Sequence, residues 1–333
     1  MRSAHHLAPA AVTLTLLLAA CQPGDQAAAP SSQQVADAFV SKVVLPEYTQ
    51  LAERSQRLAA ALDALAAEPG EAQLEQARRA WREVRTTWET GESWAFGPAE
   101  TGGFDANLDD WPVNEKDLRT ALASGALSPE LFARLTTTAK GFHGIEAVLH
   151  GTGGPRPRAN QLSASELSYL RQAGQDLAAN AKGLLTAWSG PNGLGSQFKA
   201  TGDEAVAEML QGMVGTLEEV AAEKLGKPLN SRSAEDFESF YSDNTRSDII
   251  ANLAGVQDAL SRSGLLAWIR SRDGQLASDL EQALDQAQAS AKSLPQGLNS
   301  SLSDPAGRER IQAVISSSER AVALLKQAAA SLS

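Results

Sequence analysis

Apolar residues recur at helical spacing along most of the chain, and the strict alternation typical of half-buried strands does not occur. The pattern is clearest at residues 35–67, whose apolar face consists of Val35, Ala38, Phe39, Val43, Leu51, Leu58, Leu62 and Leu65. Pro46 interrupts this run, because proline removes a backbone donor and clashes with the preceding turn. The run is therefore expected to form one bent helix or two.

The same periodicity predicts further helices, separated by segments rich in glycine and proline. They are expected at residues 71–92, 114–123, 129–150, 164–188, 203–224, 233–241, 244–260, 274–293 and 304–330. Residues 97–112 break the pattern and are expected to form a loop, too rich in glycine, proline and aspartate to be a passive linker. The sequence thus predicts an all-α fold.

A glycine-rich break at residues 190–195 divides the expected helices into two comparable groups. Each group is long enough to bury a core of its own. We therefore expect two packed helical bundles, at residues 34–190 and 191–333. Alanine is abundant and aromatic residues make up only 5% of the chain, which favours closely packed helices over sheet.

The first residues have the features of an export signal. Arg2 precedes a short apolar run that is too brief to span a bilayer, and Leu18-Ala19-Ala20 leads directly into Cys21, the only cysteine. This arrangement resembles the lipobox of bacterial lipoproteins, so residues 1–20 are expected to be a removed signal peptide and Cys21 the lipidated N-terminus. A plain secreted protein with an incidental cysteine is the alternative. Residues 21–33 would then form a flexible tether.

Charge narrows the choice of partners. The chain carries a net charge of −11, and removing the signal peptide with Arg2 leaves −12. Such acidity argues against a nucleic-acid partner and suits a protein that attracts cations. The lipid bilayer, reached through acylated Cys21, is the first expected partner. The residue after the cysteine is Gln22 and not aspartate, a pattern that resembles lipoproteins sorted to the outer membrane. We therefore expect a lipid-anchored protein on the periplasmic side of the envelope, at the outer membrane.

The sharpest local feature is Gly141-Phe142-His143-Gly144-Ile145-Glu146. On a helix, His143 and Glu146 lie one turn apart on the same face, where an imidazole and a carboxylate can share a metal ion. This donor pair suits zinc, iron or copper better than calcium. The alternative is a His and a Glu that merely hydrogen-bond on a helix face. His150 lies about 10 Å further along the helix and is expected to act indirectly or to face the surface.

Five separated segments resemble the imelysin family, a group of bacterial periplasmic or outer-membrane-anchored proteins. They are residues 81–89 (WREVRTTWE), 96–98 (FGP), 109–112 (DDWP), 141–146 (GFHGIE) and 237–253 (FESFYSDNTRSDIIANL). The resemblance implies two helical bundles with a site between them, built around the Gly-x-His-x-x-Glu motif, and a role in iron uptake. The family has also been classed as metallopeptidases, a label the motif does not secure. His150 departs from the family pattern.

Other residues are expected to complete the site. Glu92 and Asp110 are candidate accessory metal ligands. Glu92 ends the expected helix at residues 71–92, which carries a stripe of tryptophans, and Asp110 lies in the segment that follows it. The alternative is that both are solvated charges or helix caps. The remaining candidates would line a ligand pocket: Trp111, Ser239, Ser242 and Asp243. For the tryptophans of this region, Trp111 included, a role as a core or loop anchor is the favoured interpretation.

Three functions remain open. The leading hypothesis is a lipoprotein that binds a metal, with iron first and zinc second, or an iron-bearing ligand, and that works with membrane proteins of iron uptake. The second is a metal-dependent peptidase in which His143 and Glu146 hold zinc. The third is a structural or partner-binding lipoprotein. A serine nucleophile is not indicated, because no Gly-x-Ser-x-Gly motif is present.

Overall fold

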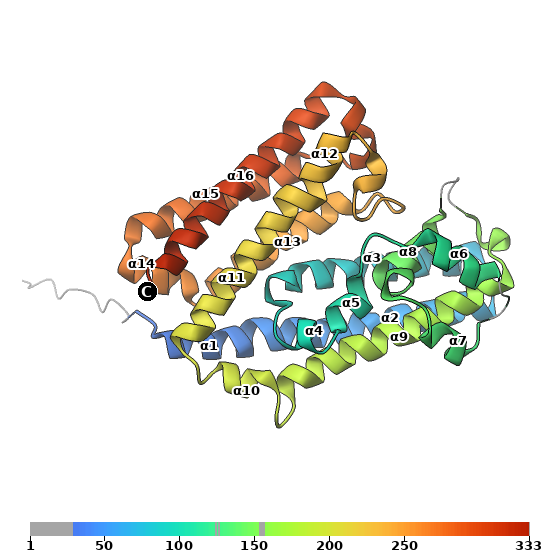
Figure 1. Cartoon of the computed structure of the whole chain (residues 1–333), viewed down its shortest axis with the longest axis horizontal. Helices are drawn as coiled ribbons and strands as arrows, with labels where there is room; N and C mark the ends of the chain where they lie inside the picture. The colour runs from blue at the N-terminus through green and yellow to red at the C-terminus, as the bar shows by residue number, and fades with distance from the viewer. Residues whose placement is uncertain (1–28, 124, 126, 153–156, 333) are drawn as a thin grey trace, which may run out of the picture.

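The computed structural model describes residues 29–123, 125, 127–152 and 157–332, and this part of the chain contains helices, turns and loops but no strand. Its helices form two groups that lie side by side (Figure 1). The long helices of the first group are α2 (Leu45–Ala67), α3 (Glu71–Gly91) and α9 (Ala164–Ser189), and those of the second are α11 (Asp203–Glu219), α13 (Thr245–Arg262), α15 (Gly274–Ser293) and α16 (Pro305–Ala330). The expected all-α, two-bundle fold is confirmed.

The chain enters the first group through α1 (Ser32–Phe39), whose N-terminus is capped by the side chain of Ser31. A π-helical segment, Val40–Val44, connects α1 to α2 without a break. Pro46 lacks the N–H that would bond to the carbonyl of Lys42, and the guanidinium of Arg262 donates to that carbonyl instead. The proline is therefore accommodated within a continuous helix, and α1 begins within the expected tether.

The expected metal motif lies on the short helix α8 (Gly141–His150). Four further short helices precede it in the chain: α4 (Pro98–Thr101), α5 (Phe104–Asp109), α6 (Glu115–Ala123) and α7 (Pro129–Ala133). The segment expected as a loop at 97–112 thus contains two of them. The helix expected at 129–150 is in fact divided, because the chain turns after α7 and Gly141 adopts a positive φ of 58°. The metal motif consequently lies at a helix start.

The second group begins after α10 (Leu194–Phe198). Helix α11 continues through a second π-helical segment, Val220–Gly226, into α12 (Lys227–Ser231). The helix expected at 233–241 does not form, and that prediction was wrong. Only Ala234–Asp236 forms a 3₁₀ turn, and the chain then loops back toward the first group. Helix α14 (Leu265–Arg272), which joins α13 to α15, lies between the helices expected at 244–260 and 274–293, where the periodicity predicted none.

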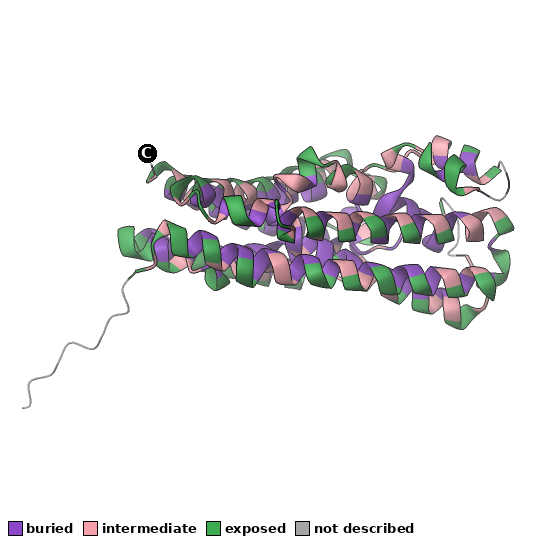
Figure 2. Cartoon of the chain, turned by 90° about the horizontal axis from the view of Figure 1, so that it is seen from below, coloured by how far each residue is buried: buried purple, intermediate pink, exposed green. Residues whose placement is uncertain are grey.

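The two groups meet closely where α13 crosses α3. Gly255 on α13 lies so near that a Cβ atom there would sit 2.0 Å from the carbonyl oxygen of Thr90. One turn earlier, the side-chain amide of Asn252 donates to the backbone carbonyl of Glu89 at 3.0 Å. Buried residues gather on the helix faces that turn toward one another (Figure 2). This contact fixes the relative position of the side chains that form the site.

The N-terminal predictions fall outside this description. The signal peptide at 1–20, Cys21 and most of the tether at 21–33 lie outside the described residues. Among the described helices, none combines the length and apolarity needed to cross a membrane. The proposed domain limits, 34–190 and 191–333, stay predictions.

Candidate metal centre

His143 occupies the first turn of α8, and two glycines let it approach its neighbours. Gly141 turns the chain into the helix with its positive φ, and a Cβ there would lie 2.3 Å from the carbonyl oxygen of Leu108. A Cβ on Gly144 would lie 2.2 Å from the hydroxyl of Tyr169. The glycines around the motif therefore permit close packing that places His143 against the end of α5.

Glu146 fixes the orientation of His143. Its Oε2 lies 3.2 Å from Nδ1 of His143, one helical turn away, so the two side chains form the hydrogen bond that was the alternative to a shared metal ion. Its Oε1 accepts hydrogen bonds from the backbone N–H and the hydroxyl of Ser242, at 2.8 and 2.6 Å. The Glu146 carboxylate is thus fully engaged in positioning the imidazole, which leaves Nε2 of His143 to face other groups.

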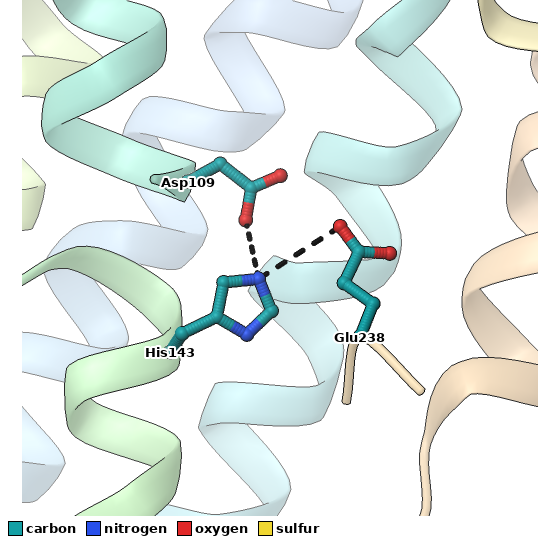
Figure 3. Close-up of side chains that lie close together, drawn as sticks. All are labelled: Asp109, His143 and Glu238. Atoms are coloured by element: carbon teal, nitrogen blue, oxygen red, sulfur yellow. Dashed lines mark ion pairs between the residues drawn. The ribbon is translucent and has the colours of Figure 1, made fainter. Parts of the chain in front are cut away.

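Nε2 of His143 faces two carboxylates from different parts of the chain (Figure 3). Oδ1 of Asp109, at the end of α5, lies 3.0 Å away, and Oε1 of Glu238, in the loop after the 3₁₀ turn, lies 3.8 Å away. The three donor atoms all lie within 4.8 Å of one another. Imidazole nitrogens and carboxylate oxygens are ligand types that zinc and non-haem iron both accept, although the common sets carry two histidines and one carboxylate.

Arg85 on α3 is buried behind this group and pairs with its carboxylates. Its guanidinium contacts Asp109 and Glu89, lies 2.9 Å from Oε1 of Glu238 and 3.9 Å from Asp248. Glu89, Glu238 and Asp248 also bring their oxygens within 4.8 Å of one another. Both groups contact Arg85, but only the first adds an imidazole nitrogen, and its two carboxylates, Asp109 and Glu238, line a cavity, so the group with His143 is the better candidate for a metal ion.

The pKa values reflect these contacts. Burial acts to raise the pKa of Asp109 and that of Glu238, but Arg85 and His143, and for Glu238 Lys224 as well, hold both below their ordinary values. Burial and Arg85 act to lower the pKa of His143, yet its hydrogen bonds to Asp109, Glu146 and Glu238 raise it well above the ordinary value. A metal ion bound to Nε2 would therefore compete with the proton that these hydrogen bonds stabilise.

A cavity of about 650 Å³ opens onto Asp109 and Glu238. Its charged lining consists of Glu92, Glu100, Asp105, Asp109, Asp110, Glu208, Glu218, Glu219 and Glu238. Within the described part of the chain, no Lys, Arg or His side chain lines it. Crowding of this kind raises the pKa of Glu219 to about 7, through burial and neighbouring carboxylates against the opposing charge of Lys224. The cavity thus favours a cationic occupant.

The predicted accessory ligands lie elsewhere in this region. Glu92 lies 3.0 Å from Nζ of Lys224 and accepts from Asn252, and no contact places it beside His143. Asp110 lines the cavity and accepts from the hydroxyl of Thr137. The structure places Asp109, its neighbour, against the imidazole.

The predicted pocket residues are divided between two roles. Trp111 lines the cavity, with Nζ of Lys227 4.5 Å from its ring centre. The other three shape the loop between the 3₁₀ turn and α13: Ser239 bonds through its backbone N–H to Thr245, Ser242 holds Glu146, and Asp243 accepts from the backbone N–H of Asn299. His150 is buried beside Trp81 and does not face the surface.

The sequence interpretation assigned no role to Arg85, Glu238 or Lys224 in the site. A signal for the two cations exists in the apolar periodicity. Arg85 stands four residues after Trp81, and Lys224 four after Val220, so each lies on a stripe that is otherwise buried. A charged residue on such a stripe indicates a buried ion pair. Glu238 follows no helix, and its position depends on the loop alone.

Comparison with known proteins agrees with this architecture. The profile of the imelysin (peptidase M75) family matches residues 44–325. Iron-regulated protein A of Synechococcus elongatus is 32% identical over 312 residues, covering 88% of this chain and 83% of that protein.

Two solved structures share the fold. A crystal structure assigned as an iron-regulated protein A precursor from Parabacteroides distasonis superimposes with a TM-score of 0.84, at 21% identity, over 93% of this chain and 98% of the other. An imelysin-like protein from Psychrobacter arcticum gives a TM-score of 0.70, at 19% identity, over 89% and 94%. At these identities the likeness concerns the fold.

Proposed function

The chain belongs to the imelysin family, and from this premise we propose that it binds a metal ion, with iron as the first candidate and zinc as the second, through His143, Asp109 and Glu238. The observation that carries the proposal is the convergence of one oriented imidazole nitrogen and two carboxylates at the inner wall of an acidic cavity. Iron is favoured because the relative in Synechococcus elongatus is named for its regulation by iron. The ion would be cargo in iron acquisition.

The cavity also bears on the form in which iron arrives. An anionic ferric chelate, such as ferric citrate, would meet a wall of carboxylates and no lining cation. Haem, with its two propionates, would meet the same obstacle. We therefore expect the free Fe²⁺ ion to bind in preference to an anionic complex.

Binding explains the site better than peptide hydrolysis does. A hydrolytic metal site needs a nearby general base whose pKa lies close to the working pH. Glu146 is engaged by His143 and Ser242, and the pKa values of Asp109 and Glu238 are held low by ion pairs. Asp109 and Glu238, the cavity-facing carboxylates nearest to His143, are therefore poor bases, and Glu219, whose pKa is about 7, is the carboxylate of this cavity that a peptidase would use as its base. A peptidase remains the second function to test.

The adjacent aspartates offer a matched test. The mature chain would be stripped with a chelator and loaded without oxygen, either with Fe²⁺ or with ferric citrate, and its bound iron measured by elemental analysis after desalting. We expect one iron per chain from Fe²⁺, little from ferric citrate, and a loss of at least tenfold in affinity for Asp109→Asn and His143→Ala. Asp110→Asn should bind as the parent does.

Three outcomes would contradict the proposal. If Asp109→Asn and Asp110→Asn bind iron equally well, the imidazole group is not the ligand set. If the parent protein cleaves an unfolded protein such as casein, loses that activity on chelation and regains it with zinc, the peptidase is favoured. Unchanged melting with Fe²⁺, Fe³⁺, Zn²⁺ and Cu²⁺ would favour the structural lipoprotein.

For location, we propose a lipid-anchored protein on the periplasmic side of the envelope, at the outer membrane, held by acylated Cys21. The support is the order of residues at positions 2–21 together with the absence of a membrane-spanning helix among the described residues. Membrane proteins of iron uptake are the proposed partners, and nucleic acid is not one of them.

A further inference from the structure

Lys224 is a buried cation in the wall beside the candidate metal centre. Its side chain is only 2% exposed, and its Nζ lies 2.7 Å from Oε2 of Glu89, 3.0 Å from Oε2 of Glu92 and 3.0 Å from Oε2 of Glu238. The ammonium donates hydrogen bonds to Glu89 and Glu92, and its contact with Glu238 is an ion pair. These contacts raise the pKa of Lys224 well above its ordinary value against the opposing effect of burial.

The helix is locally widened where it delivers this side chain. Lys224 lies in the π-helical segment Val220–Gly226, where the N–H of Lys227 bonds to the carbonyl of Ala222, five residues back. Each such insertion rotates the following residues relative to a regular α-helix, at a cost in backbone geometry, and π segments are frequent at functional sites. Helix α11 thus changes its winding in the segment that carries Lys224.

Glu238 links Lys224 to the metal centre. Its Oε1 faces Nε2 of His143, whereas its Oε2 faces Nζ of Lys224. The same carboxylate therefore serves two cation positions. The first is the group of Asp109, His143 and Glu238; the second, between Glu89, Glu92 and Glu238, is filled by an ammonium that belongs to the chain itself.

Charge and geometry at this second position suit a metal ion. Three carboxylate oxygens converge on one point, two from adjacent turns at the end of α3 and one from the loop that carries Glu238, and hard divalent cations take oxygen ligands of this kind. Without the ammonium, three buried carboxylates would repel one another with no cation in direct contact with all three. Arg85 plays no equivalent part, since its planar guanidinium lies 2.9 Å from the other oxygen of Glu238.

We propose that Lys224 is a specificity-determining residue: its ammonium fills a second cation position and so limits the centre to one metal ion. The inference rests on the proposed metal-binding function and specifies the number of ions that the site takes. A tethered monovalent charge completes the Glu89, Glu92 and Glu238 cluster permanently, whereas the imidazole group stays available for exchangeable cargo. A mononuclear centre that releases its ion suits a binding protein.

The test replaces the ammonium with an apolar side chain of similar length. The purified mature chain and its Lys224→Met variant would be stripped, equilibrated with Mn²⁺ or Fe²⁺ without oxygen, and analysed for ions per chain. We expect one ion in the parent and two in Lys224→Met. Without metal the variant should melt at a lower temperature than the parent, and Mn²⁺ should raise its melting temperature by more than it raises that of the parent.

Two control variants separate the role of Lys224 from a general loss of positive charge. Lys227→Met removes a nearby lysine, which stacks on Trp111 outside the carboxylate cluster, and should leave one ion bound. The double variant Glu92→Gln with Lys224→Met removes one carboxylate together with the ammonium. It should bind one ion and recover part of the lost melting temperature, because the remaining charge is closer to balance.

The results for the two proposals can be told apart. Two ions in Lys224→Met against one in the parent supports the inference. One ion in both overturns it while the proposed function stands. No ion in the parent but one in Lys224→Met supports a cation position at Lys224 and removes the proposed function. If the variant aggregates without metal, a soluble yield restored by Mn²⁺ but not by K⁺ supports the inference, and a yield that neither restores overturns it.

Discussion

At the scale of single residues, the carboxyl group of Glu219 shows how the acidic cavity affects stability. Burial and its carboxylate neighbours raise its pKa from 4.5 to about 7. The folded protein therefore binds this proton more tightly than the unfolded chain does, and the resulting stabilisation is complete below about pH 4.5 and disappears as the pH rises through 7. At pH 8 the folded protein holds a carboxylate where a neutral group would be preferred.

The substitution Glu219→Gln should consequently stabilise the protein at pH 8. We expect a gain of about 1–2 kcal/mol, discounted from the full pKa shift because the side chain is partly exposed, and a melting temperature higher by about 2–4 °C. Near pH 4.5 the gain should vanish. Thermal melts across this pH range measure the effect. The neighbouring Glu218, paired with Lys326 at the surface, supplies the control: Glu218→Gln should lack this pH dependence.

Residue chemistry alone located part of the site. The spacing of His143 and Glu146 predicted that they lie together, but Asp110 was the aspartate expected beside them, and the structure places Asp109 there. Periodicity cannot decide between two adjacent aspartates, because the choice depends on how α5 ends: Asp109 is its last residue, and Asp110 already has an extended backbone. Glu238 was beyond reach for the same reason, since a loop sets its direction.

At the scale of helices, the crossing of α3 and α13 is the contact most sensitive to side-chain size. Gly255→Ala would place a Cβ 2.0 Å from the carbonyl oxygen of Thr90, and neither backbone can yield without moving its helix. We expect a loss of about 1–3 kcal/mol in the free energy of unfolding, typical of overpacking, measured by chemical denaturation. Metal affinity should fall as well, because Arg85 on α3 contacts the proposed ligands Asp109 and Glu238.

A glycine on an open helix face provides the matched control. A Cβ at Gly215 on α11 would meet no atom within 4 Å. Gly215→Ala should therefore show only the higher helix propensity of alanine and stabilise the protein by up to about 1 kcal/mol. If both alanine variants unfold at the same denaturant concentration as the parent, the close approach of α3 and α13 is not a constraint on the fold.

The helices that the sequence predicted well share one property: each is long and buries a continuous stripe, as α2, α9, α15 and α16 do. The short helices α4, α5 and α7 are too brief for a period to be recognised, and their formation depends on tertiary contacts. The helix expected at 129–150 is divided because the chain turns after α7 and re-enters a helix at Gly141, whose positive φ no apolar pattern encodes.

At the scale of the whole molecule, neither bundle contains a complete site. His143, Glu146 and Asp109 come from the first half of the chain, and Glu238, Ser242 and Lys224 come from the second. The two-bundle architecture followed from the helix pattern, but the pairs that cross the interface did not, because no periodicity reports contacts between distant segments. A metal ion bound between the halves would also hold them together, which links occupancy to stability.

The proposed attachment of the molecule to a membrane depends on its first residues. With a net charge of −12, the mature chain would be repelled by anionic lipids, so electrostatic adhesion cannot hold it at a bilayer. Acylation of Cys21 with more than one chain would hold it there. A single buried acyl chain binds a bilayer only marginally, so a stable anchor needs a second chain or an added basic patch, and residues 21–31 contain no lysine or arginine. About ten residues separate Cys21 from the cap of α1, a reach of roughly 35 Å.

We therefore expect the parent protein, expressed with its signal, to remain in the membrane fraction through high-salt and alkaline washes and to be released by detergent. Cys21→Ser should appear in the soluble fraction, because its only anchor is lost, while its folded part should bind Fe²⁺ as the parent does. Incorporation of labelled palmitate into the parent, but not into the variant, measures the acylation directly. A Cys21→Ser protein that still sediments with membranes after these washes would show that another contact holds the molecule there.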